Sequence, residues 1–143
     1  MQLFGKILFP TDFSNQSNLA LKFVIDLAQQ HNSDLIILHT FRLTGEGLED
    51  EVLLNAKRDL EQDAINKFKT IENLHLKNAN IGYMFQSEVG FISDRIISNV
   101  KTHKIDLLIL CRSIQDKIME RAEKDSTCLS KKMTCPIILV PKS

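Results

Sequence analysis

Glycine is scarce in this chain of 143 residues, and no glycine follows Gly90. The part of the chain after Gly90 nevertheless contains a pattern of strand, loop, helix and strand that in nucleotide-binding α/β proteins usually carries several glycines. A phosphate group can approach a backbone closely only where no Cβ blocks it and where a positive φ is cheap. The sequence therefore predicts the scaffold of a nucleotide site without its phosphate cradle.

Other absences exclude whole classes of function. The 18 basic and 18 acidic residues cancel, so no net charge draws the chain to nucleic acid or to an anionic membrane. Tryptophan is absent and Tyr83 is the single tyrosine, which leaves few aromatic residues that could stack on bases. The longest apolar runs are far shorter than a membrane span, and the N-terminus lacks the pattern of a secretory signal. We expect no nucleic-acid partner, no membrane partner and a cytoplasmic location.

The patterns of metal and catalytic sites are also missing from the sequence. The four histidines have no metal-ligand spacing with one another or with cysteine. No Ser/His/Asp order, P-loop lysine or paired carboxylate stands out as a catalytic set. The three cysteines, Cys111, Cys128 and Cys135, indicate free thiols in a reducing compartment. We expect no metal, no catalytic residue and no enzymatic activity.

What the sequence does contain is an alternation of buried strands and amphipathic helices. Apolar runs predict strands at 6–10, 34–39, 80–86, 105–110 and 136–140, with 80–86 at a sheet edge. The predicted helices are one capped by Asp12 or Ser14 and ended by Asn32-Ser33, one after a loop at 42–49, one opened by Val89-Gly90, and one over about 117–133. Their predicted inward stripes are Ala20, Phe23, Val24, Leu27 and Ala28; Leu53, Ala56, Leu60, Ala64, Phe68 and Ile71; Ile92, Ile96, Ile97 and Val100; and Ile118, Ala122 and Leu129.

This alternation predicts the fold class. Each right-handed crossover between parallel strands lays a helix on the sheet, so strands and helices in strict alternation give a parallel sheet with helices on both faces. We find no repeat, linker or low-complexity segment. The prediction is one doubly wound α/β domain over residues 1–143.

Five stretches, spread in order along the whole chain, carry a more specific signal. They are Ile7-Leu8-Phe9-Pro10-Thr11-Asp12-Phe13-Ser14, Leu38-His39-Thr40-Phe41, Glu88-Val89-Gly90, the run 104–110, and Cys135-Pro136-Ile137-Ile138-Leu139-Val140-Pro141. Together they resemble the universal stress protein family. The resemblance implies a Rossmann-like, five-stranded parallel sheet of strand order 3-2-1-4-5, in agreement with the alternation.

One branch of that family binds ATP through a loop of pattern G-x-x-G-x9-G-[ST] after the fourth strand. The resemblance places the first two glycines on Cys111 and Ile114 and the final pair on Glu123-Lys124, with one residue too few between them. Every glycine is replaced, and the Glu123 carboxylate would repel a triphosphate by on the order of 1 to 4 kcal/mol per charge pair. A shifted register would make Ser126-Thr127 the helix-opening hydroxyls, but it restores no glycine.

The resemblance also implies which residues would line a nucleotide site at the carboxyl ends of the strands. These cofactor-binding candidates are Pro10, Asp12, Phe41, Cys111, Arg112 and Ser113. Asp12 would accept a hydrogen bond from the nucleoside, although we favour a role as a helix cap or turn residue. Pro10 and Phe41 would form an adenine wall or, equally, pack in the core.

The basic and thiol side chains near the lost loop have alternatives too. Arg112, Lys117 and Lys124 could hold an anion by charge alone, but we favour a solvated polar segment. Cys111 beside Arg112 could be a reactive thiol, and we favour a buried and inert one.

We predict a regulatory or adaptor protein that acts by protein association and uses no ATP as cofactor. The alternative is a nucleotide-binding stress protein, with slow ATP hydrolysis as one possibility, whose loop is rebuilt with basic side chains; a weaker third is a redox sensor centred on Cys111. The expected partners are a second copy of the chain and an unknown protein. The fifth strand would be an apolar sheet edge, and the resemblance implies dimerisation through it. The predicted interface is Pro136, Ile137, Ile138, Leu139 and Val140. The competing expectation is a monomer whose edge is shielded by the last helix and Lys142-Ser143.

Overall fold

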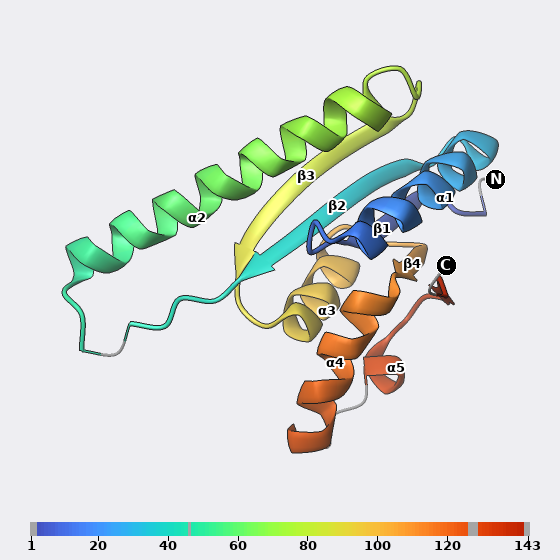
Figure 1. Ribbon diagram of the computed structural model, residues 1–143. Helices are drawn as coiled ribbons and strands as arrows, with labels where there is room; N and C mark the ends of the chain where they lie inside the picture. Colours follow the sequence, from blue (N-terminus) through green and yellow to red (C-terminus); the bar gives the residue numbers. More distant parts are fainter. Residues whose placement is uncertain (1–2, 46, 126–128, 142–143) are drawn as a thin grey trace.

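The short apolar runs of the sequence form a parallel sheet in the computed structural model, which describes residues 3–45, 47–125 and 129–141. The strands are β1 (Lys6–Pro10), β2 (Asp34–Phe41), β3 (Gly82–Val89), β4 (Leu107–Leu110) and β5 (Ile137–Leu139). They lie in the order β3-β2-β1-β4-β5, and every neighbouring pair is parallel (Figure 1). The predicted fold class and strand order are therefore confirmed.

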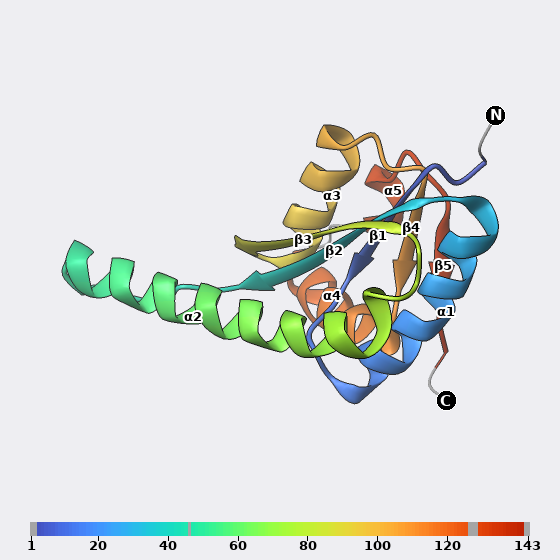
Figure 2. The same ribbon diagram turned by 90° about the horizontal axis from the view of Figure 1, so that it is seen from above.

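Helices cover the two faces of this sheet. They are α1 (Asn15–His31), α2 (Asp50–Ile71), which continues into a π-helical turn at Glu72–Leu76, α3 (Ile92–Thr102), α4 (Arg112–Asp125) and α5 (Leu129–Lys132). Seen from above, α1 and α2 lie on one side of the sheet and α3 lies on the other (Figure 2). This arrangement buries the apolar residues of the sequence, because the inner strands are apolar on both faces and the helices cover both faces.

The centre of the core is formed by β1 and β4. Ile7 and Leu8 of β1 are fully buried, and all four residues of β4 are buried. Strands that alternate polar and apolar residues could not occupy this place, because both of their faces meet helices. The core thus explains why these two runs are continuous in the sequence.

The helix α1 follows its predicted caps but turns a different face inward. Ser14 is the N-cap, since its Oγ accepts a hydrogen bond from the Ser17 backbone N–H at 3.2 Å, and Asn32 ends the helix with a φ of 51°. The prediction that Phe23 packs inward is wrong, because its side chain is 43% exposed. The buried face is rotated away from Phe23 and contains Ser17, Ala20, Leu21, Val24, Ile25 and Ala28.

The helix α2 is longer than the sheet it covers. Of its predicted inward stripe, Ala64, Phe68 and Ile71 are buried, while Leu60 is 38% exposed and Leu53 is half-buried. The first half of α2 extends past the ends of β2 and β3 (Figure 1), where no strand lies beneath it. The prediction of a buried stripe is therefore correct only for the C-terminal half.

Several element boundaries differ from the prediction. β3 runs to Val89, so Val89 belongs to a strand and α3 begins only at Ile92. β4 begins at Leu107 and β5 contains only Ile137–Leu139, so both are shorter than predicted. The largest difference is α4, which begins at Arg112 rather than near residue 117. No described helix is long and apolar enough to cross a membrane.

Candidate functional site

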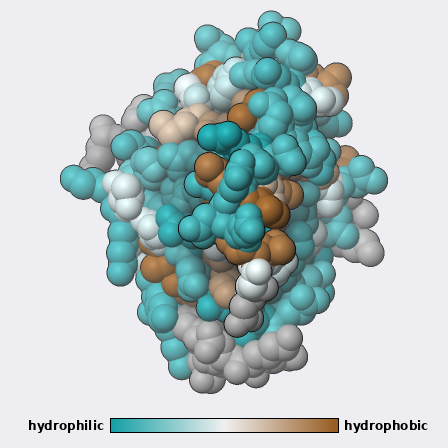
Figure 3. Space-filling model, turned by 90° about the vertical axis from the view of Figure 1, so that its left-hand side faces the viewer, coloured by the Kyte–Doolittle hydropathy of each residue, from teal (hydrophilic) through white to brown (hydrophobic). Residues whose placement is uncertain are grey.

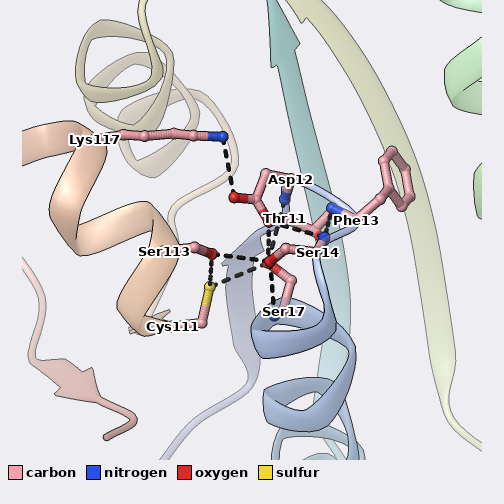
Figure 4. Close-up of polar contacts among 8 residues, drawn as sticks. All are labelled: Thr11, Asp12, Phe13, Ser14, Ser17, Cys111, Ser113 and Lys117. Atoms are coloured by element: carbon pink, nitrogen blue, oxygen red, sulfur yellow. Dashed lines mark hydrogen bonds and ion pairs between the residues drawn. The ribbon is translucent and has the colours of Figure 1, made fainter. Parts of the chain in front are cut away.

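The strand order reverses between β1 and β4, so the crevice at their carboxyl ends is where such sheets bind ligands. The turn after β1 carries Thr11, Asp12, Phe13 and Ser14 into this crevice, and Cys111 directly follows β4 on its other side. Figure 4 shows these residues with Ser17, Ser113 and Lys117. We call this group the crevice cluster.

Asp12 is the most heavily bonded side chain of the crevice cluster. Its Oδ1 accepts hydrogen bonds from the Ser14 backbone N–H at 3.0 Å and from Ser17 Oγ at 2.7 Å. Its Oδ2 accepts from Lys117 Nζ at 3.0 Å, in an ion pair across the crevice (Figure 4). Burial alone would raise the pKa of Asp12, but the hydrogen bonds from Ser14, Ser17 and Lys117 outweigh it and hold the pKa far below its usual value.

The bonds to Asp12 also hold an unfavourable backbone conformation in the turn. Phe13 has a φ of 60°, in the left-handed region that a bulky residue rarely adopts. Its N–H donates to Thr11 Oγ1 at 3.1 Å, and the next N–H, of Ser14, donates to Asp12. Because these two side chains fix the turn on both sides of Phe13, the turn-forming role favoured for Asp12 is what the contacts describe.

The remaining cluster residues fill the space beneath Asp12 with small polar groups. Cys111 is 1% exposed and Ser17 is fully buried, and Cys111 Sγ lies 3.1 Å from Ser17 Oγ. Ser113 Oγ lies 3.3 Å from the same sulfur and 3.1 Å from Ser14 Oγ. The thiol is thus buried as expected and shares its hydrogen-bonding environment with hydroxyls.

The segment after β4 is a helix, where the ATP-binding pattern would need a loop. Arg112 is the first residue of α4, and the Gln115 N–H already donates to the Cys111 carbonyl at 3.0 Å. Gln115 Nε2 donates to the Leu110 carbonyl at 3.2 Å, so the helix is tied to the end of β4. The prediction of a loop before residue 117 is therefore wrong. This segment contains neither glycine nor proline, so no residue in it opposes a helix.

The basic residues near the lost loop are engaged within the protein. Arg112 is exposed and pairs with Asp116 at 3.2 Å along α4, which agrees with the solvated segment that we favoured. Lys117 pairs with Asp12 at 3.0 Å while its side chain stays exposed to solvent. The side chains of Glu123 and Lys124, and residues Ser126, Thr127 and Cys128, lie outside the described part of the chain, as does the predicted inward side chain of Ala122.

The predicted nucleotide-lining residues do not share one open cavity. Pro10 and Phe41 are buried, while Asp12, Cys111 and Ser113 are joined by hydrogen bonds in the crevice cluster. A small cavity of about 80 Å³ lies between α1 and the end of β5. It is lined by Gln16, Leu19, Ala20, Cys111, Arg112, Val140 and Pro141.

A much larger cavity, of about 670 Å³, opens beside the cluster on the side of α3. Its lining is Thr40, Arg42, Gly90, Phe91, Ile92, Ser93, Lys117, Glu120 and Arg121. Sequence reasoning singled out Lys117 from this set and missed Arg42, Phe91 and Arg121. One signal was available, since Lys117 and Arg121 are four residues apart and share a face of a helix. The position of Arg42 beside Phe91 depends on a contact between distant segments and left no local signal.

A group of aromatic rings lies on the face of β2 opposite to the cavity, because His39 and Phe41 alternate along the strand with the cavity-lining residue Thr40. The His39 ring packs 5.0 Å from the Phe13 ring and 6.3 Å from the Phe41 ring, between ring centroids. His39 Nδ1 lies 3.2 Å from Ser87 Oγ. Burial, together with the charges of Lys67 and Lys117, lowers the pKa of His39 to about 4, so this ring is neutral at pH 7. Among the described residues, no group of three His, Cys, Asp or Glu side chains could hold a metal ion.

The parallel sheet, its strand order and the polar crevice at the switch point define a Rossmann-like α/β protein. Within that class, the model of the universal stress protein family matches residues 3–141, and the chain belongs to this family. No curated protein matches the sequence.

Solved structures with the same fold include three universal stress proteins. UspA from Lactobacillus plantarum has a TM-score of 0.74 at 17% identity, with 96% of this chain and 97% of that chain covered. A universal stress protein in complex with cAMP has a TM-score of 0.67 at 16% identity, with 98% of each chain covered. A family protein from Arabidopsis thaliana with AMP bound has a TM-score of 0.63 at 12% identity, with 96% of this chain and 92% of that chain covered. At these identities the likeness establishes the fold.

Proposed function

We propose that this universal stress protein is a non-catalytic regulatory or adaptor domain that acts by protein association, as a homodimer, and does not hold ATP in its crevice. One observation carries the proposal: the crevice cluster and α4 occupy the places that a nucleotide would need. The Asp12 carboxylate is taken by Lys117 and Ser17, and the chain enters a helix directly after β4.

The free energy of nucleotide binding would have to offset these internal contacts. A ribose hydroxyl that replaced Ser17 or Lys117 at Asp12 would exchange one hydrogen bond for another, with little net gain out of the ~1 kcal/mol that such a bond contributes. Phosphate oxygens would meet a helix, in which only the first-turn amides lack an internal partner. The Asp12 side of the crevice thus offers a nucleotide a carboxylate that is already engaged, and the α4 side offers only these first-turn amides.

The dimer is supported by the free edge of the sheet. β5 pairs with β4 on one side, and among the described strands it has no neighbour on the other. Leu139 is 58% exposed, and Ile137 and Ile138 are half-buried, so the edge presents apolar side chains to solvent. Uncovered apolar edges favour pairing with another strand.

Thermal unfolding with and without about 1 mM Mg-ATP tests the nucleotide part of the proposal. We expect an unchanged midpoint, whereas a ligand present at 100 times its Kd would stabilise the fold by ~2.7 kcal/mol and raise Tm by several degrees. The variant Lys117→Met separates the two obstacles, because it frees Oδ2 of Asp12 and leaves α4 in place. We expect no ATP-dependent shift in this variant either, and a shift confined to it would mean that the ion pair alone closes the crevice.

The competing function is a nucleotide-binding stress protein. It is favoured by the cavity of about 670 Å³ next to the crevice and by the family members that hold cAMP and AMP. The same unfolding experiment with AMP and cAMP decides between the two functions. A saturable rise of Tm with either nucleotide, or with ATP, would replace the non-nucleotide proposal.

A further inference from the structure

We propose that the cavity beside α3 is a binding site for a small organic or inorganic anion that carries a carboxylate or phosphate group. The site lies next to the crevice cluster and uses different residues, apart from Lys117, which lies between the two. It goes beyond the proposed function, which requires no ligand. A volume of about 670 Å³ lies within the range of small-molecule sites.

Positive side chains from separate elements converge on this cavity. Arg42 follows β2, while Lys117 and Arg121 come from one face of α4. The Arg42 guanidinium carbon lies 3.9 Å from the centroid of the Phe91 ring, and that of Arg121 lies 3.7 Å from the same centroid. One aromatic ring therefore positions two guanidinium groups at the cavity wall, which reduces the entropy that each would lose on binding an anion.

The charges of these two arginines are not balanced in the same way. Arg121 Nη1 pairs with Asp94 Oδ2 at 2.9 Å and contacts Ser93 Oγ at 3.2 Å. Arg42 is exposed, and among the described residues no ion pair to it is found. An anion in the cavity would offset the positive charge that the two guanidinium groups bring to its wall. Arg42 is therefore the side chain that we expect to contribute most to binding.

The start of α3 also favours a negatively charged ligand. Gly90, Phe91, Ile92 and Ser93 line the cavity, and no side chain caps the helix at Phe91. The first backbone N–H groups of a helix lack internal partners and attract negative charge. Gly90 has a φ of 139°, which only glycine adopts readily, and a Cβ there would lie 3.0 Å from Arg95 Cδ.

Glu120 sets a limit on the ligand. Its carboxylate belongs to the lining and repels negative charge, so a ligand charged along its whole length, such as a triphosphate, is disfavoured. A compact anion with one charged end avoids this repulsion. The site thus selects small anions and agrees with the absence of ATP binding in the proposed function.

The test is an NMR titration of the whole ¹⁵N-labelled chain with sodium phosphate and, separately, sodium acetate, against sodium chloride at matched ionic strength. We expect saturable shifts of the Ile92 and Ser93 amides with phosphate, acetate or both, and none with chloride. Saturation by phosphate alone identifies a phosphate ligand, and saturation by acetate alone identifies a carboxylate ligand. Shifts that are linear, or the same as those in chloride, would overturn the proposal.

Two variants test the assignment to Arg42. Arg42→Gln should weaken the apparent affinity about tenfold, the loss expected when one charge-assisted contact of ~1.4 kcal/mol is removed. Arg58→Gln, at an exposed arginine on α2, is the matched control and should leave the affinity unchanged. Equal affinity in wild type and Arg42→Gln contradicts the site. Nucleotide binding in the crevice would instead shift the Asp12 and Ser113 amides. The titration therefore distinguishes a failure of the anion site from a failure of the proposed function.

Discussion

Asp12 combines a structural and an electrostatic role in a single carboxylate. Its two oxygens accept hydrogen bonds from Ser14, Ser17 and Lys117, and its side chain is only 14% exposed. The Lys117 side chain is 54% exposed, so this ion pair alone contributes little to stability. The bonds from Ser14 and Ser17 are less open to water and explain why the ionised form of Asp12 is favoured.

This protonation state leads to a pH prediction. Because the folded-state pKa of Asp12 lies below its unfolded value of about 3.8, ionised Asp12 stabilises the fold above pH ~4, and this contribution is lost as the pH falls through the folded pKa. Asp12→Asn should therefore lower the free energy of unfolding by ~1–3 kcal/mol at pH 7 and by progressively less below pH ~4. Urea unfolding of both proteins between pH 2.5 and 7 measures this. An Asn variant with the same deficit at both ends of that range would show that the ionisation of Asp12 is irrelevant.

At the scale of elements, α4 is what separates this chain from an ATP-binding pattern. Ile114, which stands where the second glycine would be, is 1% exposed and packs in the core. Restoring a glycine there removes a buried side chain and adds a flexible residue near the start of a helix. The lost packing and the lower helix propensity act in the same direction.

We therefore predict that Ile114→Gly destabilises the fold by at least ~3 kcal/mol without creating ATP binding. The combined change to glycine at Cys111, Ile114 and Glu123, with serine at Lys124, should likewise fail to bind ATP at micromolar concentration. Urea unfolding and calorimetry with Mg-ATP measure the two effects. Ile114→Ala is the control that keeps helix propensity and loses only packing. Micromolar ATP affinity in the fourfold variant would mean that the helical form of this segment is not what blocks the site.

The helix α2 offers a second test at this scale, because its two halves differ in burial. Phe68 is 8% exposed and Leu60 is 38% exposed, although both lie on the predicted stripe. Phe68→Ala should cost ~3–5 kcal/mol of unfolding free energy, and Leu60→Ala less than ~1 kcal/mol. Chemical denaturation of the pair measures the difference. Similar losses at both positions would mean that the first half of α2 is covered in solution. Figure 3 shows the molecule from the left-hand side of Figure 1, where hydrophobic patches lie among hydrophilic atoms.

A structural feature of this protein could be predicted from the sequence where neighbouring residues determine it, and could not where it depends on contacts between distant segments. Continuous apolar runs such as Ile7–Phe9 identify inner strands, because only a doubly covered strand tolerates them. The exposure of Phe23 was not predictable, since the stripe of α1 fits two adjacent faces and the sheet decides between them. The pairing of Lys117 with Asp12 joins residues 105 positions apart, and no local pattern encodes it. The position of the crevice cluster could thus be predicted from the sequence, but the ion pair and hydrogen bonds that occupy Asp12 could not.

At the scale of the whole molecule, the free edge of β5 is the surface best suited to a second copy. The Leu108 N–H donates to the Pro136 carbonyl and the Val140 N–H donates to the Leu110 carbonyl, at 3.0 and 2.9 Å. In a parallel ladder alternate residues bond the same neighbour, so the N–H and C=O groups of Ile137 and Leu139 point to the free side. An antiparallel copy would place Ile137 of one chain opposite Leu139 of the other and satisfy these groups by two-fold symmetry.

We predict that Leu139→Lys and Ile138→Lys convert a dimer to a monomer while leaving the fold intact. Leu139 is already 58% exposed in the single chain, so a lysine there costs little until a partner buries its charge. Light scattering at tens of micromolar distinguishes a 16.3 kDa monomer from a dimer. Met119→Lys, on α4 at 60% exposure, is the matched control and should remain dimeric. A wild-type monomer would contradict the homodimer itself, and a dimer that survives both β5 variants would place the interface elsewhere on the surface.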